Sequence, residues 1–429
     1  MKLKKLPLAA FAFCGFFTAI NPVFAQTWTQ TSAPTNYGWT SVASSADGTK
    51  LVAVGYFSIY TSTNSGVTWI SNAPSADWIS VASSADGNKL VAAAGYYNGF
   101  IYTSTNAGAT WLVTSAPDTN WVSVASSADG TKLVAAAGNG YTFNGITIPG
   151  LIYTSTNSGT SWTATSAPST NWQTVASSAD GTKLVAVVAG AVDGGIGSDG
   201  EPYGVETDGL IYTSTNAGAT WQATSAVAFG WNSVASSADG SKLIAASWGG
   251  WLVSSTNSGA TWATVNLPPN TNYFTCVASS ADGSKLVAIA NLVNCGGQGL
   301  IYISTNSGAS WMDTSAPNQD FRSVACSPDG NKLVAAVNGG GIYTWKYYAL
   351  TEPPIGYLNA TGNGGTGICL DFLTQTNTIY YVQASSNLTT WTNFDGPFLG
   401  DGSLFIKTYP TTNQSNCFYR FSATSLESW

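Results

Sequence analysis

Two short segments alternate along most of the chain and repeat almost without change. One runs from Ile59 to Trp69 and occurs six times. The other runs from Trp39 to Ala53, occurs seven times, and opens each time with an aromatic residue. Successive copies of this aromatic residue lie 39 to 59 residues apart. Such a period is typical of arrays in which each repeat is one small unit that cannot bury its apolar face alone.

Each repeat predicts four short strands. The runs Trp39–Ser45 and Lys50–Val54 are rich in Val and Ala, as strands buried on both faces are. An Ala-Asp-Gly turn joins them, because Asp caps local N–H groups and Gly accepts a positive φ. The third and fourth strands, Ser58–Thr63 and Thr68–Asn72, flank an Asn-Ser-Gly turn. Four strands in a repeat of this length indicate the blade of a β-propeller.

The two ends of the array complement each other. The seventh copy stops after its third strand, Gly341–Trp345, whereas Thr27–Pro34 matches the fourth strand of other repeats, such as Ser161–Pro168. We therefore expect the N-terminal segment to complete the last blade, so that no open sheet edge remains. The predicted fold is all-β, a seven-bladed β-propeller closed by the N-terminal strand. A linear solenoid would need capping repeats, and none is visible.

The third and fourth strands carry a motif with a known counterpart. Ser62-x-Asn64-x-Gly66-x-Thr68-Trp69 resembles the Asp-box (BNR) repeat of sialidase-like propellers and of photosystem II assembly factors. Asn stands in every copy where those families have Asp, so the turn keeps its side-chain acceptor and loses its charge. The resemblance implies a propeller. It implies no ligand, because the box is a structural turn in those families.

Further segments flank the repeats. Residues 1–25 have the basic, apolar and small-residue regions of a secretory signal peptide, and the apolar run is shorter than a membrane anchor needs. We expect the propeller at 26–348, a linker at 349–354 and a small β-sandwich at 355–429. The segment Tyr381–Trp391, together with Phe418-Tyr419-Arg420, resembles a C-terminal module of secreted bacterial proteins, which implies an accessory role. The expected location is extracellular or at the cell surface, with the periplasm as an alternative.

Composition excludes several classes of function. The chain has 14 basic and 21 acidic residues, so it would repel a phosphate backbone, and we expect no nucleic-acid partner. The absence of His removes the commonest general base and metal ligand, and with them Ser-His-Asp and Cys-His catalysis. The two arginines, Arg322 and Arg420, fall in different predicted domains, so a sialidase arginine cluster cannot form. We expect no cofactor and a monomer.

Six cysteines are present, one of them in the leader. An exported chain can form disulfides. Cys369 and Cys417 are the only pair in the C-terminal module, and we expect them to bridge. Cys276 and Cys295 lie near the start of a first strand and in the variable loop of the same repeat, so they are candidates for a second bridge. Cys326 would then stay free, and no pair has the spacing of zinc ligands.

Ligand binding is expected in the loops that differ between repeats, which share one face of a propeller. Aromatic side chains there offer flat apolar surfaces with polar edges, suited to sugar rings or to a protein partner. The alternative is that these loops only cover their own strands. The candidate ligand-binding residues are Tyr96, Tyr97, Phe100, Tyr141, Phe143, Tyr203, Trp248 and Trp251.

The longest variable loop, in the fourth repeat, is acidic. Carboxylates interleaved with Gly could chelate Ca²⁺, but their spacing does not match an EF-hand, and a solvated loop is favoured. The weak metal candidates are Asp193, Asp199, Glu201 and Asp208.

Two functions follow from these observations. The first is an exported, non-catalytic binding or scaffolding protein that recognises an extracellular glycan or protein through the variable loops. The alternative is a glycoside hydrolase acting on a neutral polysaccharide. Such an enzyme needs two carboxylates about 5 to 10 Å apart. Asp77, Asp118, Asp320 and the acidic loop are the possible sources of that pair.

Overall fold

The computed structural model describes most of the repeat region and the strands of the C-terminal segment. Contacts divide the chain into one compact unit, Gln26–Tyr347, and a second unit that contains the C-terminal segment. We describe each unit by itself. The described residues are 28–95, 99–138, 142–143, 146–147, 150–193, 205–207, 209–265, 273–291, 299–346, 361–362, 367–373, 378–385, 392–399, 404–410 and 418–425.

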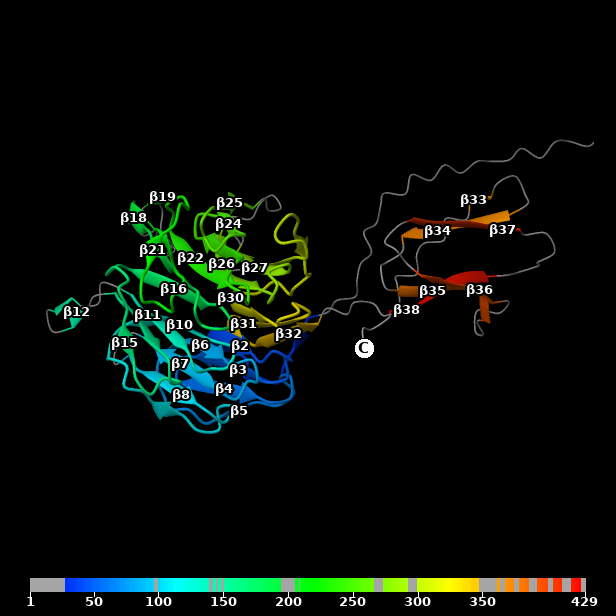
Figure 1. Ribbon diagram of the computed structural model, residues 1–429. Coiled ribbons are helices and arrows are strands. Elements are labelled where there is room, and N and C mark those ends of the chain that lie inside the picture. The colour runs from blue at the N-terminus through cyan, green and yellow to red at the C-terminus, as the bar shows by residue number, and fades with distance from the viewer. Residues whose placement is uncertain are drawn as a thin grey trace, which may run out of the picture. The chain divides into compact units, whose positions relative to one another are not determined.

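The described residues of the first unit form sets of four antiparallel strands, which we call blades and number in chain order. Five of these sets are separate four-stranded sheets, and two are joined into one eight-stranded sheet. The first strands of the blades contact one another in a closed cycle and gather at the centre of the unit (Figure 1). The first strands are β2 (Tyr37–Ser44), β6 (Trp78–Ser83), β10 (Trp121–Ser126), β16 (Trp172–Ser177), β22 (Trp231–Ser236), β26 (Tyr273–Ser279) and β30 (Phe321–Cys326).

Second and third strands follow outward from the centre in each blade. The second strands are β3 (Leu51–Gly55), β7 (Leu90–Ala94), β11 (Leu133–Ala137), β17 (Leu184–Val188), β23 (Leu243–Ser247), β27 (Leu286–Asn291) and β31 (Lys332–Gly340). The third strands are β4 (Ser58–Ser62), β8 (Ile101–Ser104), β14 (Ile152–Ser155), β20 (Ile211–Ser214), β24 (Leu252–Ser255), β28 (Gly299–Ser304) and β32 (Ile342–Lys346).

The outermost strands are shorter than the sequence predicts. Only two residues pair in each, where the repeats suggested about five, because the preceding Thr-Trp pair still belongs to the turn. The outer strands are β5 (Ile70–Ser71), β9 (Leu112–Val113), β15 (Thr163–Ala164), β21 (Gln222–Ala223), β25 (Ala263–Thr264), β29 (Met312–Asp313) and β1 (Thr29–Gln30).

Two small hairpins extend from the connections between second and third strands. They are formed by β12 (Thr142–Phe143) with β13 (Ile146–Thr147), in blade 3, and by β18 (Ala191–Asp193) with β19 (Val205–Thr207), in blade 4. The described residues contain no helix, and hence none long and apolar enough to cross a membrane. The expectation of an all-β propeller is confirmed.

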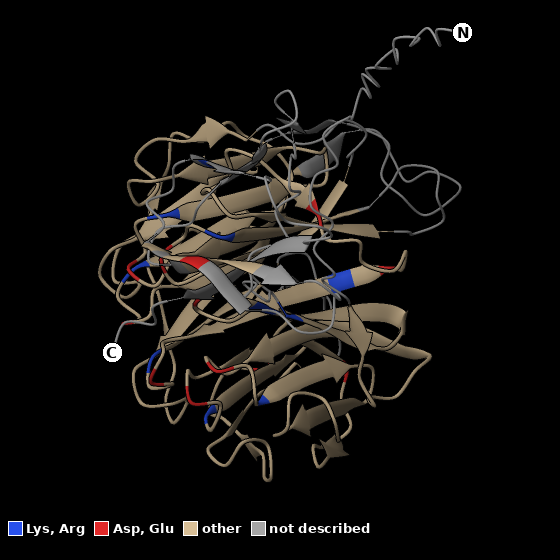
Figure 2. Ribbon diagram, turned by 90° about the vertical axis from the view of Figure 1, so that its right-hand side faces the viewer, with Lys and Arg blue, Asp and Glu red and all other residues tan. Residues whose placement is uncertain are grey.

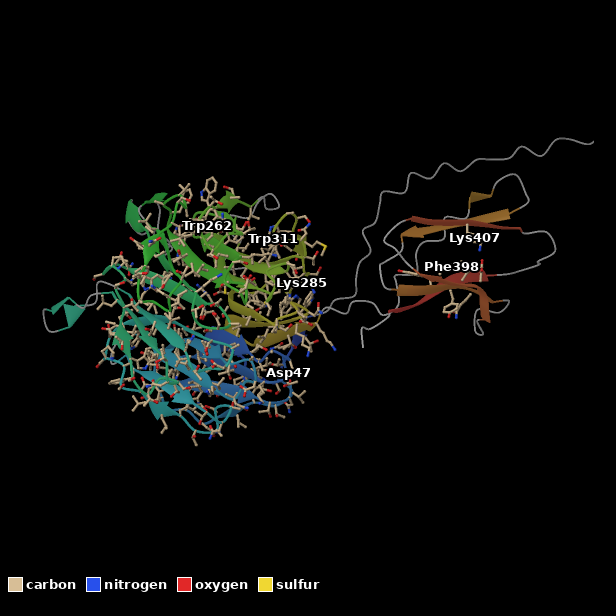
Figure 3. All side chains as sticks on the ribbon, viewed as in Figure 1. Asp47, Trp262, Lys285, Trp311, Phe398 and Lys407 are labelled. Atoms are coloured by element: carbon tan, nitrogen blue, oxygen red, sulfur yellow. The ribbon has the colours of Figure 1, made fainter. Side chains whose placement is uncertain are left out.

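Large aromatic side chains fill the spaces between blades. Trp78 and Trp121, at the start of their first strands, are 0% exposed. Trp78 packs with Val52 and Val54 of the preceding blade and meets the ring of Tyr102 edge-on, with 5.2 Å between ring centroids. Figure 3 shows side chains throughout these spaces. Burial of such rings is the main apolar contribution that holds neighbouring blades together.

The turns that join first and second strands are linked by a series of backbone hydrogen bonds around the centre. Ala46 N donates to Ala85 O at 2.7 Å, and the same bond recurs from blade to blade as far as Pro328 O. Pro328 has no N–H, so the series is interrupted between blades 7 and 1. Lys332 Nζ donates to the carbonyl of Asp47 across that junction.

Blade 7 and blade 1 are also joined by strand pairing. β1 pairs with β32, with Thr29 opposite Thr344, so the N-terminal strand is the outer strand of blade 7. The start of β2 pairs with the end of β31, which extends two residues further than β27 and three further than the other second strands. Ser323 Oγ accepts from Val42 N at 3.1 Å near the centre. These bonds hold together residues that lie 281 to 315 positions apart.

The C-terminal unit contains two three-stranded antiparallel sheets, as a small β-sandwich would. One sheet has the order β33 (Thr361–Gly362), β34 (Gly367–Leu373), β37 (Leu404–Pro410), and the other has the order β36 (Thr392–Leu399), β35 (Thr378–Ser385), β38 (Phe418–Ser425). The alternation of apolar and polar residues predicts strands at Ile368–Leu373, Ile379–Ala384, Ser403–Thr408 and Phe418–Ser422, close to β34, β35, β37 and β38. It predicts neither β33 nor β36. Lys407 Nζ pairs with Asp395 at 2.7 Å in this unit.

Candidate functional site

The propeller has two faces that differ in how their connections are built. On one, which we call the turn face, Ser65 N donates to Thr49 O at 2.8 Å, so the two tight turns of a blade lie together. On the other, the loop face, the connection between second and third strands bonds to the entry of the next blade. Phe57 N, for example, donates to Ala76 O at 3.0 Å. The variable loops therefore share one face, as the sequence predicts.

Turn-face polar groups are committed to the turns themselves. Asp47 accepts hydrogen bonds from Ser45 Oγ at 2.6 Å and from Thr49 N at 2.9 Å. The bond from Ser45 is the main reason that the pKa of Asp47 falls to about 2. The same arrangement recurs in the other blades, and Figure 2 shows acidic and basic residues side by side in turns at one end of the unit. We assign these aspartates a structural role.

The Asn turns satisfy their own backbone. Asn64 Oδ1 accepts from Thr68 N at 2.9 Å, and Asn64 Nδ2 donates to Thr68 Oγ1 at 2.9 Å. Ser62 Oγ accepts from Gly66 N at 2.9 Å. An uncharged Asn therefore makes the side-chain-to-backbone bonds that the sequence analysis expects of it. Because the geometry repeats in every Asn turn, no single copy stands out as a ligand site.

The loop face carries an aromatic platform, formed by Trp251 stacked on Phe229. The ring centroids are 5.0 Å apart and the planes differ by 14°. Trp251 is 43% exposed even though one side of its indole is covered. Its position is fixed by a bond from Trp251 N to Ser247 Oγ at 3.0 Å and by Phe229 N donating to Gly209 O. The sequence predicts a role for Trp251, which lies in the variable loop between the second and third strands. It does not predict one for Phe229, which precedes the first strand of the same blade.

The other aromatic candidates are less informative. Trp248 and Phe100 are half-buried on the same face. Only the backbone of Phe143 is described, in β12. The remaining candidates, Tyr96, Tyr97, Tyr141 and Tyr203, lie outside the described residues.

A second set of differences lies in the first strands, at a position that sequence analysis overlooked. Each first strand has a β-bulge just after its opening aromatic residue, as between Trp39 and Ser41. The residue at the bulge differs between most blades, whereas its neighbours hardly change. Bulges re-aim side chains and are frequent beside functional sites. We call these seven residues the bulge ring: Thr40, Ile79, Val122, Gln173, Asn232, Thr275 and Arg322.

Polar members of the bulge ring are linked from blade to blade. Gln173 Nε2 donates to Asn232 Oδ1 at 3.2 Å, and Asn232 Nδ2 donates to Thr275 O at 2.9 Å. Thr275 Oγ1 then donates to Phe321 O at 3.3 Å. Ile79 and Val122 occupy the same position in blades 2 and 3. The ring is thus polar over blades 4 to 7 and apolar over blades 2 and 3.

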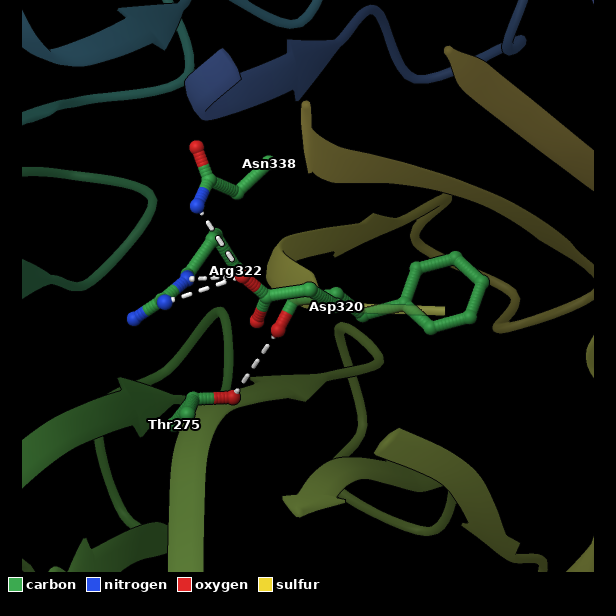
Figure 4. A network of polar contacts seen from close by, with 5 residues as sticks. Thr275, Asp320, Arg322 and Asn338 are labelled. Carbon is green, nitrogen blue, oxygen red and sulfur yellow. Dashed lines mark hydrogen bonds and ion pairs between the residues drawn. The ribbon is translucent and has the colours of Figure 1, made fainter. Parts of the chain in front are cut away.

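Arg322 is the most exposed member of this ring. Its Nε and Nη2 atoms both donate to Asp320 Oδ2, at 3.2 and 2.9 Å, and Asn338 Nδ2 donates to the same oxygen at 3.0 Å (Figure 4). The Arg322 side chain is 42% exposed. Among the described residues, Nη1 of Arg322 has no hydrogen-bond partner, and neither does the buried Oδ1 of Asp320. This ion pair therefore presents the N–H donors of Arg322 Nη1 at the loop face and carries little net charge.

Three of the carboxylates proposed for catalysis lie in separate connections: Asp77 precedes β6, Asp118 precedes β10 and Asp320 precedes β30. Asp320 is held by Arg322 and Asn338, and Asp118 is exposed. No group of three or more Asp, Glu or Cys residues that could hold a metal ion occurs in the described part of the chain. Of the acidic-loop candidates, Asp193 is described only as backbone of β18, and the other three lie outside the described residues.

The cysteines correct one expectation. Cys276 is a free thiol, so the suggested Cys276–Cys295 bridge is wrong for this structure. Its side chain occupies a position where most blades have Ser, and it points to the neighbouring blade, with Sγ 3.8 Å from Val324 O. Cys326 is also free, and burial is the main cause that raises its pKa to about 12. Cys369 lies in β34, and Cys417 lies outside the described residues, so that bridge stays a prediction.

Comparisons with known proteins identify the fold. No family model and no curated protein matches the chain. Two solved structures of YCF48, one bound to D1 peptide and one from Cyanidioschyzon merolae, are each 15% identical to it with a TM-score of 0.53. Each alignment covers 75% of this chain, and 97% and 98% of those chains respectively.

A GH74 xyloglucanase from Xanthomonas campestris is similar to the same degree. It is 15% identical, with a TM-score of 0.52 over 74% of this chain and 53% of that chain. The present chain therefore spans about half the length of the xyloglucanase. Likeness at this level of identity concerns the fold, and together with the closed cycle of sheets it shows that residues 26–347 form a β-propeller.

Proposed function

We propose that this chain is an exported, non-catalytic binding propeller that takes an extracellular glycan or protein on its loop face. One observation carries the proposal. The repeats are nearly identical at the turn face, yet they differ at the bulge ring and in the loops of the opposite face. A surface that only had to close the ring could repeat itself, whereas one asymmetric ligand requires side chains that differ around the axis.

The similar structures support a binding role without fixing the ligand. One YCF48 structure holds a peptide, which makes a protein segment a reasonable ligand class for this propeller. The likeness to a xyloglucanase makes a polysaccharide the other proposed ligand class. The Asp-box-like turns, the expected leader at residues 1–25 and the C-terminal module fit an exported monomer with no nucleic-acid partner, and these remain part of the proposal.

Glycoside hydrolysis is the second candidate, favoured by the fold of the xyloglucanase. It requires a pair of carboxylates at a suitable separation on the loop face. Asp320 is a poor member of such a pair, because its Oδ2 atom already accepts hydrogen bonds from Arg322 and Asn338. Asp77, Asp118 and residues of the acidic loop are the remaining sources of catalytic carboxylates.

A glycan array and a pull-down from the source organism, both with residues 26–429, test the proposal together. Binding of either a glycan or a protein that is lost when loop-face residues are substituted supports it. Turnover of a chromogenic neutral glycoside would favour the hydrolase instead. A chain that captures nothing in either assay, or binding that persists after the loop face is altered, would contradict the proposal.

A further inference from the structure

In the described part of the loop face, backbone groups of neighbouring connections are paired with one another. The connections on this face bond to one another: Thr119 N donates to Gly99 O at 3.3 Å and Thr170 N donates to Gly150 O at 3.1 Å. A peptide that adds itself as an extra strand needs a row of unpaired backbone groups at a sheet edge. In these blades the connections already use such groups for each other.

The aromatic platform suits the apolar side of a sugar ring. Phe229 covers one side of the Trp251 indole, which keeps the ring in one orientation, and Trp251 is still 43% exposed. The face of an aromatic ring is electron-rich, so it attracts the weakly positive C–H groups on the flat side of a pyranose. A pre-oriented indole also loses little conformational entropy when a ligand stacks on it.

The Arg322–Asp320 pair supplies hydrogen-bond donors without a strong net charge. Asp320 Oδ2 accepts from both Nε and Nη2 of Arg322, which leaves Nη1 for a ligand oxygen. An unpaired arginine would favour a carboxylate, because a charged ligand would neutralise it. Here Asp320 already neutralises Arg322 at 2.9 Å, so an anionic ligand would meet repulsion from the carboxylate together with attraction from the guanidinium.

Resting on the proposed function, we infer that the ligand is a neutral oligosaccharide. One sugar unit stacks on Trp251, and Arg322 donates a hydrogen bond to a hydroxyl oxygen at a second subsite on the same face. Asp320 acts on selectivity by cancelling the charge of Arg322. The remaining donors of the guanidinium are satisfied by the ligand or by water.

The test measures affinity of residues 26–429 for soluble neutral polysaccharides, such as xyloglucan and mannan, and for polygalacturonate as the carboxylated probe. The unsubstituted chain should bind a neutral probe more tightly than the carboxylated one. Trp251→Ala should weaken binding about tenfold or more, and Arg322→Gln about tenfold. Leu112→Ala, which removes an exposed apolar side chain from an outer strand, should leave the affinity unchanged.

Asp320→Asn gives the sharpest result, because it removes the compensating charge and keeps the shape. We expect this variant to gain affinity for polygalacturonate by about tenfold at low salt. Stronger binding of polygalacturonate by the unsubstituted chain, or no gain in Asp320→Asn, would overturn the inference. So would a chain that captures a protein partner and no neutral glycan, although the proposed function would then stand. Capture of neither ligand class would remove both.

Discussion

The turn face and the loop face are built from the same strands, yet they use sequence in opposite ways. At the turn face every blade repeats one set of bonds, such as Ser45 to Asp47, and the corresponding residues hardly vary. At the loop face the bulge ring changes between Thr, Ile, Val, Gln, Asn and Arg, although successive copies lie only 39 to 59 residues apart. The residues that repeat in every blade are those that close the ring. The residues that vary between blades are those with which the propeller can distinguish one ligand from another.

The largest contrast should appear between two tryptophans. Trp121→Ala removes a side chain that is 0% exposed between blades, and we expect a loss of about 3 to 5 kcal/mol in the free energy of unfolding. Trp251→Ala removes a ring that is 43% exposed, and the loss should stay under about 1 kcal/mol. Urea denaturation followed by circular dichroism measures both. Equal losses would mean that Trp251 is a structural residue rather than a platform.

Two glycines give a smaller contrast of the same kind. Gly130, at the turn face, has φ +66°, and an added Cβ would lie 2.7 Å from Lys89 Cβ. Gly130→Ala should therefore destabilise the propeller by about 2 kcal/mol. At Gly249, on the loop face, an added Cβ would lie 3.7 Å from the nearest side-chain atom, which is an ordinary van der Waals contact. Gly249→Ala should change stability by less than about 0.5 kcal/mol, and thermal unfolding of both variants checks the pair.

The smallest effect per residue concerns pH. Hydrogen bonds lower the pKa of Asp47 and Asp180 from 3.8 to about 2, so the folded state favours the charged form. Their stabilisation is present above pH 4 and is lost as pH falls from 4 to 2. After allowance for solvent screening each turn should contribute about 0.5 kcal/mol. Melting temperatures across this range should fall less steeply in Asp47→Asn, and an unchanged slope would show that the turn aspartates do not control acid stability.

Much of the fold could be predicted because its causes are local and repeated. The Asp-Gly turns, the opening Trp residues and the Val-Ala strands each specify their structure within a few residues, and the match of Thr27–Pro34 to the outer strands identified the N-terminal partner of blade 7. β36 was missed because Gly396 and Pro397 interrupt its alternation. The two-residue outer strands could not be predicted, since pairing there depends on where the turn ends in space.

The candidate site was less accessible to sequence analysis. Trp251 stood out as an aromatic residue in a variable loop, but its stacking on Phe229 depends on how two connections meet. The bulge ring is visible in the sequence as one variable position inside an almost constant segment. Only the structure shows that the register of the first strand shifts at this residue. Cys276 was assigned a partner by proximity along the blade, whereas its side chain faces the next blade.

The pairing of β1 with β32 also governs when the molecule can become complete. β1 pairs with a strand that lies more than 300 residues further along the chain, and the bond between Trp28 Nε1 and Thr314 Oγ1 spans 286 positions. Contacts of such long range raise the contact order and are formed late, after the local hairpins of each blade. Without blade 7, β1 has no strand to pair with, and the face of blade 1 that packs against blade 7 has no cover. Closure of the ring between blades 7 and 1 is therefore the last step of folding, and it makes the stability of each blade depend on the others.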